Sequence, residues 1–253
     1  MSENIKLASP KLVAPFIYEA EDSRSLHFSN NQLQSMMSIS KPDQLQVDYT
    51  KTMMGFLILN RRPKHIAMIG LGGGSLAKFC YKHLPETRIT VIENNPHVIA
   101  LREDFMVPED NERFRVIEAD GADFVQDTES EYDVLLVDGY DHQGQSPQLC
   151  TQYFYDNCYK VLADQGVLVV NLFEEHQLYE VFIGRLDRTF DGNMAEVSAN
   201  HAGNIVVFAG KNIAISPHAL RCHIEASQSS LNEHQSLNKA FQVNDVNSLA
   251  VTS

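Results

Sequence analysis

A strand pattern that runs into a glycine-rich turn is the feature that most constrains the fold of this chain. Residues 66–69 are all apolar and lead into Gly70-Leu71-Gly72-Gly73-Gly74-Ser75, and a second strand pattern over residues 89–92 ends in Glu93. Glycines let the backbone approach a ligand closely, and the N–H groups of the following helix face that ligand. An acid at the tip of the second strand can accept both hydroxyls of a ribose. Together these features predict the first half of a nucleotide-type α/β site, more firmly than the Gly-x-Gly-x-Gly motif alone.

Strand patterns and helix patterns alternate along the chain from residue 64 onward. The expected strands are residues 65–70, 88–93, 114–119, 132–138 and 166–172. The expected helices between them are residues 75–83, 96–105, 121–125 and 149–162. A strand that is apolar throughout, such as residues 134–137, is buried on both faces, as in a parallel sheet. The alternation therefore predicts an α/β fold built around a parallel sheet.

The end of this alternating region distinguishes between two kinds of α/β fold. A helix pattern at residues 174–189 is followed by an antiparallel hairpin pattern at residues 195–199 and 204–209. Five parallel strands closed by such a hairpin resemble the Rossmann-like, seven-stranded fold of S-adenosylmethionine-dependent transferases. They resemble a six-stranded nicotinamide-binding sheet less well.

The segments on either side of this region have patterns of their own. Residues 11–40 are rich in β-formers around a hairpin-type turn at Asn30-Asn31, and a helix is expected from residue 41 to about residue 60. The expected organisation is an N-terminal β-hairpin unit with a linking helix (1–60), a nucleoside-binding Rossmann-like catalytic domain (61–215) and a polar, partly helical tail (216–253). Apolar residues near the start of the β-unit would be exposed if they were left unpaired, which predicts a homodimer or homotetramer. These residues are Leu12, Val13, Phe16 and Ile17.

Composition and charge exclude several classes of function. A net charge of −13 disfavours nucleic acid or an anionic membrane surface as the main partner. No apolar run approaches the length of about 18 residues that a membrane span needs. The first six residues lack the basic-then-apolar order of a secretory signal, so a cytoplasmic location is expected. His142, His176 and His201 lack metal-ligand spacing with another His or Cys, so no metal is expected.

Acids occupy the tips of three neighbouring strand patterns. Glu93, Asp120 and Asp138 each follow an expected strand, and Asp141 lies three residues beyond the last of them. Ligands bind outside the carboxyl ends of the strands in such sheets. Glu93 is expected on a ribose and Asp120 on an adenine amino group, with helix capping as the alternative for both. Asp138 and Asp141 can attract an ammonium group, and one of them can take its proton, with loop capping as the alternative for Asp141.

At these positions the sequence resembles the spermidine synthase family, the polyamine aminopropyltransferases, over roughly residues 12–215. The resemblance depends on Gly70–Ser75, Glu93, Ala119-Asp120-Gly121 and the segment from Tyr132 to Asp141, which is similar to the family's Tyr-Asp-Val-(apolar)₃-Asp-x-x-Asp. Residues 149–155 and 31–34 are similar to two further family segments. The resemblance implies transfer of the aminopropyl group of decarboxylated S-adenosylmethionine to a small cationic amine such as putrescine.

The resemblance also implies a role for individual residues. It implies that Asp138 is the proton acceptor and that Tyr140 and Asp141 bind the amine. The expected nucleoside-binding residues are Gln34, Gly70, Gly72, Gly74, Glu93, Asp120 and Gly121.

The sequence departs from the family pattern at several positions. Gly73 stands where the family's glycine loop carries an Asp, and Tyr49-Thr50-Lys51 stands where it has Tyr-His-Glu. Asp141-His142 replaces an Asp-Pro, and residues 200–203 lie in the region of a Tyr-Pro-Ser-Gly segment. A missing acid at Gly73 removes a repulsion against the carboxylate of intact S-adenosylmethionine. Two alternatives therefore stay open, a methyltransferase and a non-catalytic paralogue that binds a nucleoside or a partner protein.

Overall fold

The computed structural model describes residues 12–29, 32–141, 144–199, 203–218, 220–222 and 224. Expectations that concern Asn30-Asn31, His142, residues 200–202 and most of the C-terminal tail lie outside these residues. None of the helices formed within the described ranges has the length and apolar character of a membrane span.

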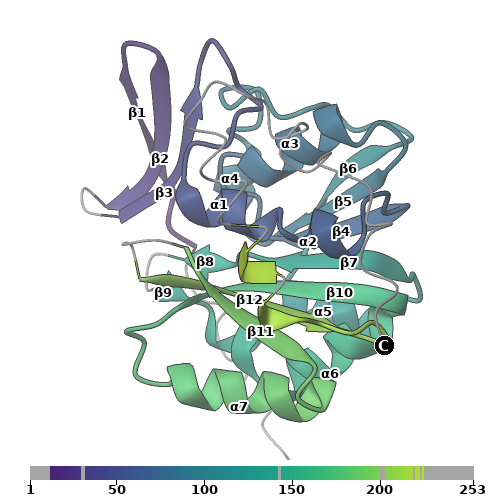
Figure 1. The fold of residues 1–253 in the computed structure, drawn as a ribbon. Coiled ribbons are helices and arrows are strands. Elements are labelled where there is room, and N and C mark those ends of the chain that lie inside the picture. Colours follow the sequence, from purple (N-terminus) through teal and green to yellow (C-terminus); the bar gives the residue numbers. More distant parts are fainter. Residues whose placement is uncertain are drawn as a thin grey trace, which may run out of the picture.

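A seven-stranded sheet forms the centre of the molecule (Figure 1). Five strands run parallel to one another, namely β4 (His65–Ile69), β5 (Arg88–Glu93), β6 (Phe114–Glu118), β7 (Tyr132–Val137) and β10 (Leu162–Phe173). The hairpin strands are β11 (Met194–Ser198) and β12 (Asn204–Gly210), and β12 lies antiparallel to β10. The spatial order is β11-β12-β10-β7-β4-β5-β6. The sheet confirms the predicted α/β fold of the S-adenosylmethionine-dependent transferase type.

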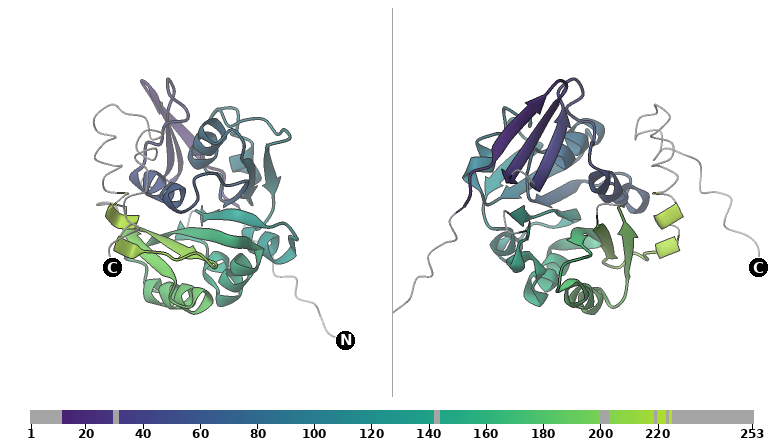
Figure 2. Two further views of the ribbon diagram at one scale, coloured as in Figure 1. Left: turned by 45° about the vertical axis from the view of Figure 1, so that its right-hand side comes forward. Right: turned by 90° about the vertical axis from the view of Figure 1, so that its left-hand side faces the viewer.

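Helices cover both faces of this sheet (Figures 1 and 2). The first face carries α1 (Asp48–Met53), α2 (Phe56–Leu59), α3 (Ser75–His83) and α4 (Pro96–Ile99). The second face carries α5 (Gly121–Asp127), α6 (Gln152–Val161) and α7 (Tyr179–Phe190). In β4, Ile66 and Met68 pack into the first core, whereas Ala67 and Ile69 pack into the second. Successive side chains of a strand point to opposite faces, so a strand between two helical layers must be apolar throughout.

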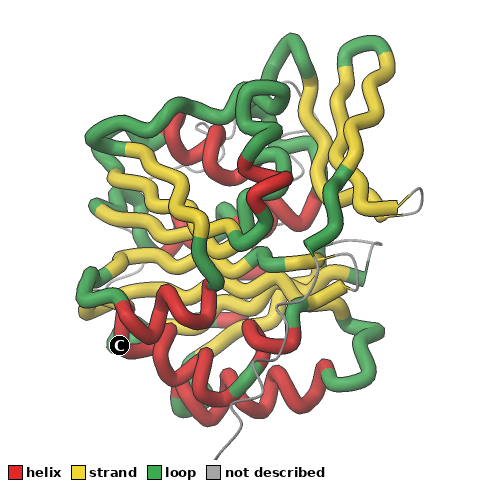
Figure 3. Tube along the Cα trace, turned by 180° about the vertical axis from the view of Figure 1, so that it is seen from behind, coloured by secondary structure: helices red, strands yellow, loops and turns green. Residues whose placement is uncertain are grey.

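The N-terminal residues form a separate antiparallel sheet of β1 (Phe16–Ala20), β2 (Ser23–Ser29) and β3 (Gln32–Ser38). Figure 3 shows this sheet beside the central one rather than continuous with it. Leu26 and Met37 are buried in the first core cluster, so the small sheet is attached through its apolar face. This confirms the expected β-unit, while the domain boundaries at 60/61 and 215/216 stay predictions.

The residues expected to drive oligomer formation have different environments. Phe16 is exposed, Ile17 packs against the core, and both Val13 and the partly exposed Leu12 line a cavity. Tyr18, at 62% exposure, lies beside Phe16 on the same strand. The homodimer or homotetramer stays a prediction.

The linking helix is shorter than its sequence pattern indicates. Regular helix begins at Asp48, and α1 and α2 are separated at Met54-Gly55. Asp43, expected in the first turn, accepts instead from Lys82 at 2.8 Å and His83 at 3.3 Å in α3. The expected start of the helix at residue 41 is therefore wrong, because tertiary contacts take the side chain that could have capped it.

Other helices also differ from their expected bounds. The helix expected at 96–105 is regular only over α4, and turns continue to residue 106. The helix expected at 174–189 begins at Tyr179. The helix expected at 149–162 is divided into a short 3₁₀ turn (Pro147–Cys150) and α6. A two-stranded ribbon of β8 (Tyr140–Asp141) and β9 (Gly144–Gln145) was not predicted.

Candidate active site

A cavity of about 1020 Å³ opens at the carboxyl ends of β4, β5, β6 and β7. Its wall includes the residue at or just after the end of each of these strands: Gly70, Glu93, Asp120 and Asp138. Parallel strands end at one edge of the sheet, and this is the edge where α/β proteins bind ligands. Further parts of the wall come from β2, β3, α1, the start of α3, the segment around Ser146, and residues of β10 and β12.

The glycine loop after β4 has a backbone that only glycine adopts easily. Gly70 has a φ of +99°, and a Cβ there would lie 2.3 Å from the carbonyl oxygen of Asp138. Gly74 has a φ of +68° at the start of α3, where a Cβ would lie 2.4 Å from Val107. Gly70 and Gly72 line the cavity, whereas Gly74 shapes the loop from outside it. The glycines therefore let three segments approach one another closely.

Glu93 is held by backbone N–H groups of the two loops beside it. Its Oε2 accepts from the N–H of Leu71 at 2.9 Å and its Oε1 from that of Asn95 at 2.8 Å. Asn95, rather than Glu93, caps α4 by accepting from the N–H of His97 at 3.0 Å. Burial raises the pKa of Glu93, and the backbone donors oppose that rise. The carboxylate thus joins the glycine loop to the tip of β5 at the cavity wall.

Asp120 and Gly121 each have a structural role, apart from any role in binding. Asp120 caps α5, because its Oδ1 accepts from the N–H groups of Ala122 at 2.7 Å and Asp123 at 3.4 Å. The capping alternative considered for Asp120 is therefore present, and the same residue lines the cavity. Gly121 lies outside the cavity lining, and a Cβ there would be 2.4 Å from Ile69. Its lack of a side chain allows α5 to pack closely on β4.

Asp138 lies at the end of β7 and receives hydrogen bonds from side chains of two other elements. Tyr49 in α1 donates to Oδ2 at 3.0 Å, and the Asn171 amide in β10 donates to Oδ1 at 2.9 Å. Burial raises the pKa of Asp138, and these two bonds oppose the rise. Burial and the charge of Asp138 also raise the pKa of Tyr49 well above its usual value, so the phenol remains a neutral donor.

Asn171 is in turn oriented by its neighbours. The amide of Asn204 in β12 donates to its side-chain oxygen at 3.0 Å. Its backbone carbonyl accepts from the Tyr140 hydroxyl and from the Gln145 amide, both at 3.3 Å. The Asn171 side-chain oxygen is thereby occupied, so its N–H₂ group faces Asp138. The arrangement presents Asp138 to the cavity in one orientation.

Three residues of this site were not predicted from the sequence as site residues: Tyr49, Asn171 and Asn204. Asn171 lies inside β10, between the apolar run 167–170 and Leu172-Phe173 at the end of the strand. A polar residue within an otherwise apolar strand is the signal that could have identified it. Tyr49 matches the Tyr of the family's Tyr-His-Glu segment.

The other predicted residues are placed as follows. Gln34 in β3 and Tyr140 in β8 line the cavity. Asp141 pairs with Gly144 in the short ribbon, and its side chain lies outside what the structure describes. The described part of the chain contains no group of three or more His, Cys, Asp or Glu that could hold a metal.

The charges of the cavity wall have one sign. Among the described residues that line it, Glu93, Asp120 and Asp138 are acidic, and none is Lys, Arg or His. Gly73 does not line the cavity, and a Cβ there would be 2.7 Å from the Ser35 hydroxyl. A longer side chain at position 73 has no room in this arrangement.

The comparisons with known proteins agree with this geometry. The family profile described as "Spermine/spermidine synthase domain" matches residues 46–205. A polyamine aminopropyltransferase of Chromobacterium violaceum is 40% identical over 194 residues, which cover 76% of this chain and 74% of that relative.

Two solved structures share the fold. A spermidine synthase in complex with the transition-state analogue AdoDATO has a TM-score of 0.62 and 19% identity, covering 90% of this chain and 85% of that one. Human methyltransferase-like protein 13 in complex with SAH has a TM-score of 0.62 and 21% identity, covering 81% of this chain and 98% of that one. At these identities the likeness concerns the fold, which the two proteins share. The profile match over more than half of the chain and the similarity to the bacterial relative show that this chain belongs to the spermine/spermidine synthase family.

Proposed function

We propose that this protein transfers an aminopropyl group from decarboxylated S-adenosylmethionine to a small cationic amine of the putrescine type. The charge of the cavity is the observation that carries the proposal. Three carboxylates line it, and its described lining contains no Lys, Arg or His. The decarboxylated cosubstrate has a sulfonium and an ammonium group and no carboxylate, so its charge complements this wall. Intact S-adenosylmethionine would bring a carboxylate that needs a donor of its own.

The nucleoside of the cosubstrate would occupy the end of the cavity near Glu93. This carboxylate at the tip of β5 would accept from the ribose hydroxyls, and Asp120 would accept from the adenine amino group. Gln34 from β3 lies on the same cavity wall. Gly70 and Gly72 leave room for the backbone of the loop to approach the ligand.

The transfer step would take place at Asp138. The acceptor enters as an ammonium ion, and Asp138 takes one of its protons to leave a neutral amine. The nitrogen lone pair then attacks the aminopropyl carbon attached to sulfur. A C–N bond forms as the C–S bond breaks, and the sulfur departs as neutral methylthioadenosine. Burial raises the pKa of Asp138, which makes this carboxylate a stronger base toward an ammonium group.

Methyl transfer from intact S-adenosylmethionine is the second candidate. Position 73 carries no acid, so the loop itself does not repel a carboxylate at that point. The fold does not decide between the two reactions, because spermidine synthases and methyltransferases share it.

The two candidates release different products, which allows a direct test. Purified protein is incubated with putrescine and either the decarboxylated or the intact cosubstrate, and the nucleoside products are separated by liquid chromatography and mass spectrometry. We expect methylthioadenosine and an aminopropylated amine from the decarboxylated form. Formation of S-adenosylhomocysteine from the intact form would instead show that the protein transfers a methyl group. Calorimetric titration with both cosubstrates completes the test, since failure to bind either would leave the non-catalytic paralogue.

A further inference from the structure

Lys78 is a deeply buried lysine that the proposed reaction does not use. It lies in α3 just after the glycine loop, with 4% of its surface exposed. Its Nζ donates to the carbonyl oxygen of Phe105 at 2.7 Å and to the sulfur of Met37 at 2.9 Å. Neither acceptor carries a formal charge. Burial of an amine beside uncharged acceptors is costly, so its position calls for a physical reason.

Both acceptors belong to segments that pack against the glycine loop. A Cβ at Gly73 would lie 2.8 Å from the ring of Phe105, so this ring packs directly on the loop. Val107 packs against Gly74 in the same way. Met37 belongs to β3, two residues after Ser35, a residue that lines the cavity. One amine therefore connects the two segments that confine the loop.

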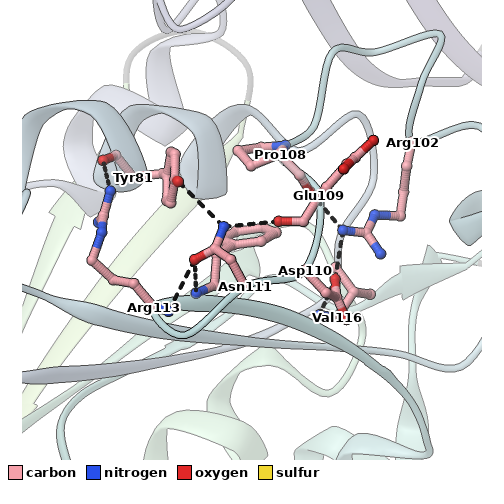
Figure 4. Close-up of polar contacts among 9 residues, drawn as sticks. Tyr81, Arg102, Pro108, Glu109, Asp110, Asn111, Arg113 and Val116 are labelled. Atoms are coloured by element: carbon pink, nitrogen blue, oxygen red, sulfur yellow. Dashed lines mark hydrogen bonds and ion pairs between the residues drawn. The ribbon is translucent and has the colours of Figure 1, made fainter.

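The outer end of the segment after α4 is attached to α3 by other contacts (Figure 4). Asn111 donates to the hydroxyl of Tyr81 at 3.2 Å, and Arg113 donates to its carbonyl oxygen at 2.8 Å. Arg102 pairs with Asp110 at 2.7 Å within the segment. These contacts fix residues 108–113, while Lys78 holds the inner part, at residue 105, where the segment touches the loop.

We propose that Lys78 is a positioning residue for the nucleoside end of the cavity. By holding the turn at residues 101–107 and strand β3 against the glycine loop, it maintains the loop shape that binds the nucleoside. The inference rests on the proposed function for the identity of that nucleoside. Lys78 itself does not line the cavity, so it acts through Phe105 and Met37.

The charge state of Lys78 does not alter this role. Burial lowers the pKa of Lys78 to about 7, and the charge of Asp43 opposes that shift. Asp43 itself pairs with Lys82 and His83 in the same helix. Both forms of the amine are present near neutral pH, and the neutral form still has two N–H donors for two acceptors. Loss of the donors, rather than loss of the charge, is the change that should loosen the loop.

The substitution Lys78→Met tests the inference, because it keeps most of the buried stem and removes the donors. Lys82→Met is the matched control, since Lys82 lies in the same helix with 60% of its side chain exposed. We expect the Kd of Lys78→Met for 5′-methylthioadenosine to rise about tenfold, the effect of losing one such hydrogen-bonded link. Hydrogen exchange should accelerate at residues 70–75 and 101–107. Lys82→Met should leave both quantities near their wild-type values.

The outcomes separate this inference from the proposed function. The titrations are made at a temperature at which all three proteins are folded. An unchanged Kd, with exchange accelerated uniformly over the central sheet, would show that Lys78 only adds stability and would overturn the inference. If the wild-type protein binds no methylthioadenosine, the proposed function fails. Hydrogen exchange alone then tests the positioning role of Lys78. Unchanged exchange of Lys78→Met at residues 70–75 and 101–107 would overturn it.

Discussion

The carboxylates of the proposed nucleoside end (Glu93) and the proposed transfer end (Asp138) of the cavity are held by different means. Glu93 accepts hydrogen bonds from the backbone N–H groups of Leu71 and Asn95, which lie in the loops directly after β4 and β5. Asp138 is held by side chains, one from Tyr49 in α1 and one from Asn171 in β10. The first arrangement follows from the course of the backbone, whereas the second needs particular residues on elements far apart in the chain.

This difference indicates how each end can vary. Any sequence that builds the glycine loop and the tip of β5 supplies the donors for Glu93, so the nucleoside end depends mainly on the fold. One substitution on α1 or β10 can remove a hydrogen bond to Asp138 without changing the course of the backbone. We therefore expect the nucleoside end to be common to proteins of this fold and the transfer end to set the chemistry.

Asp138→Asn should have the largest effect, and it tests whether the transfer end depends on the carboxylate of Asp138. If Asp138 is the proton acceptor, turnover should fall by roughly 10²–10⁴-fold, while the Kd for methylthioadenosine stays nearly the same. Product formation and calorimetry measure the two quantities. Asp133→Asn on the same strand is the control, because Asp133 lies at the opposite end of β7 and holds the backbone of Lys64 and His65. Wild-type turnover in Asp138→Asn would show that Asp138 is not the proton acceptor.

Glu93→Ala addresses the nucleoside end. Binding of methylthioadenosine should weaken by about 1.5–3 kcal/mol if the carboxylate meets the ribose hydroxyls. The stability of the protein should fall as well, because the N–H groups of Leu71 and Asn95 lose their acceptor. Glu118→Ala is a matched control, since Glu118 is paired in register with Glu93 on the next strand and lies outside the cavity. An unchanged Kd would exclude Glu93 from the site.

Gly73→Ala tests how tightly Ser35 and Phe105 pack against the glycine loop. The new Cβ would lie 2.7 Å from the Ser35 hydroxyl and 2.8 Å from the Phe105 ring. Such overpacking should lower the free energy of unfolding by about 1–3 kcal/mol in urea titrations. Gly184→Ala in α7 should instead stabilise the protein by about 0.5–1 kcal/mol, since its Cβ would meet no atom within 4 Å apart from its neighbours in the chain and the backbone of its own helix. A neutral Gly73→Ala would show that the loop is not confined.

Tyr49→Phe should have a smaller effect that sharpens the description of the transfer end. The hydrogen bond from Tyr49 favours the charged form of Asp138, so its loss should raise the pKa of Asp138 further. Activity that needs the carboxylate is lost as the pH falls through this pKa. The acidic limb of the kcat/KM profile should therefore move to higher pH, and the loss of activity relative to wild type should grow as the pH falls. A limb at the same pH would show that Tyr49 does not act on Asp138.

Much of the fold could be predicted because it depends on local pattern. The apolar strands that end in glycine or acid, and the helices between them, determine a parallel sheet and the edge at which its ligands bind. The linking helix was predicted too long because Asp43 pairs with α3 instead of capping a helix start. The pattern of residues 41–60 contains no sign of this contact.

Part of the site could be predicted for the same reason. Glu93, Asp120 and Asp138 stand at strand tips, and their positions follow once the strands are assigned. The roles proposed for them stay predictions. Asn204 and Lys78 could not be identified in this way, because each acts on a residue of another element.

The sequence by itself determined the sheet, the glycine loop and the row of acids at one edge, since these depend on residues that are neighbours in the chain. Only the tertiary structure decided that Tyr49 and Asn171 hold Asp138, at separations of 89 and 33 residues. It also decided that the buried amine of Lys78 on α3 donates to Phe105, whose ring packs on the glycine loop. Hydrogen bonds between distant side chains depend on how the elements pack, and local periodicity contains no information about them.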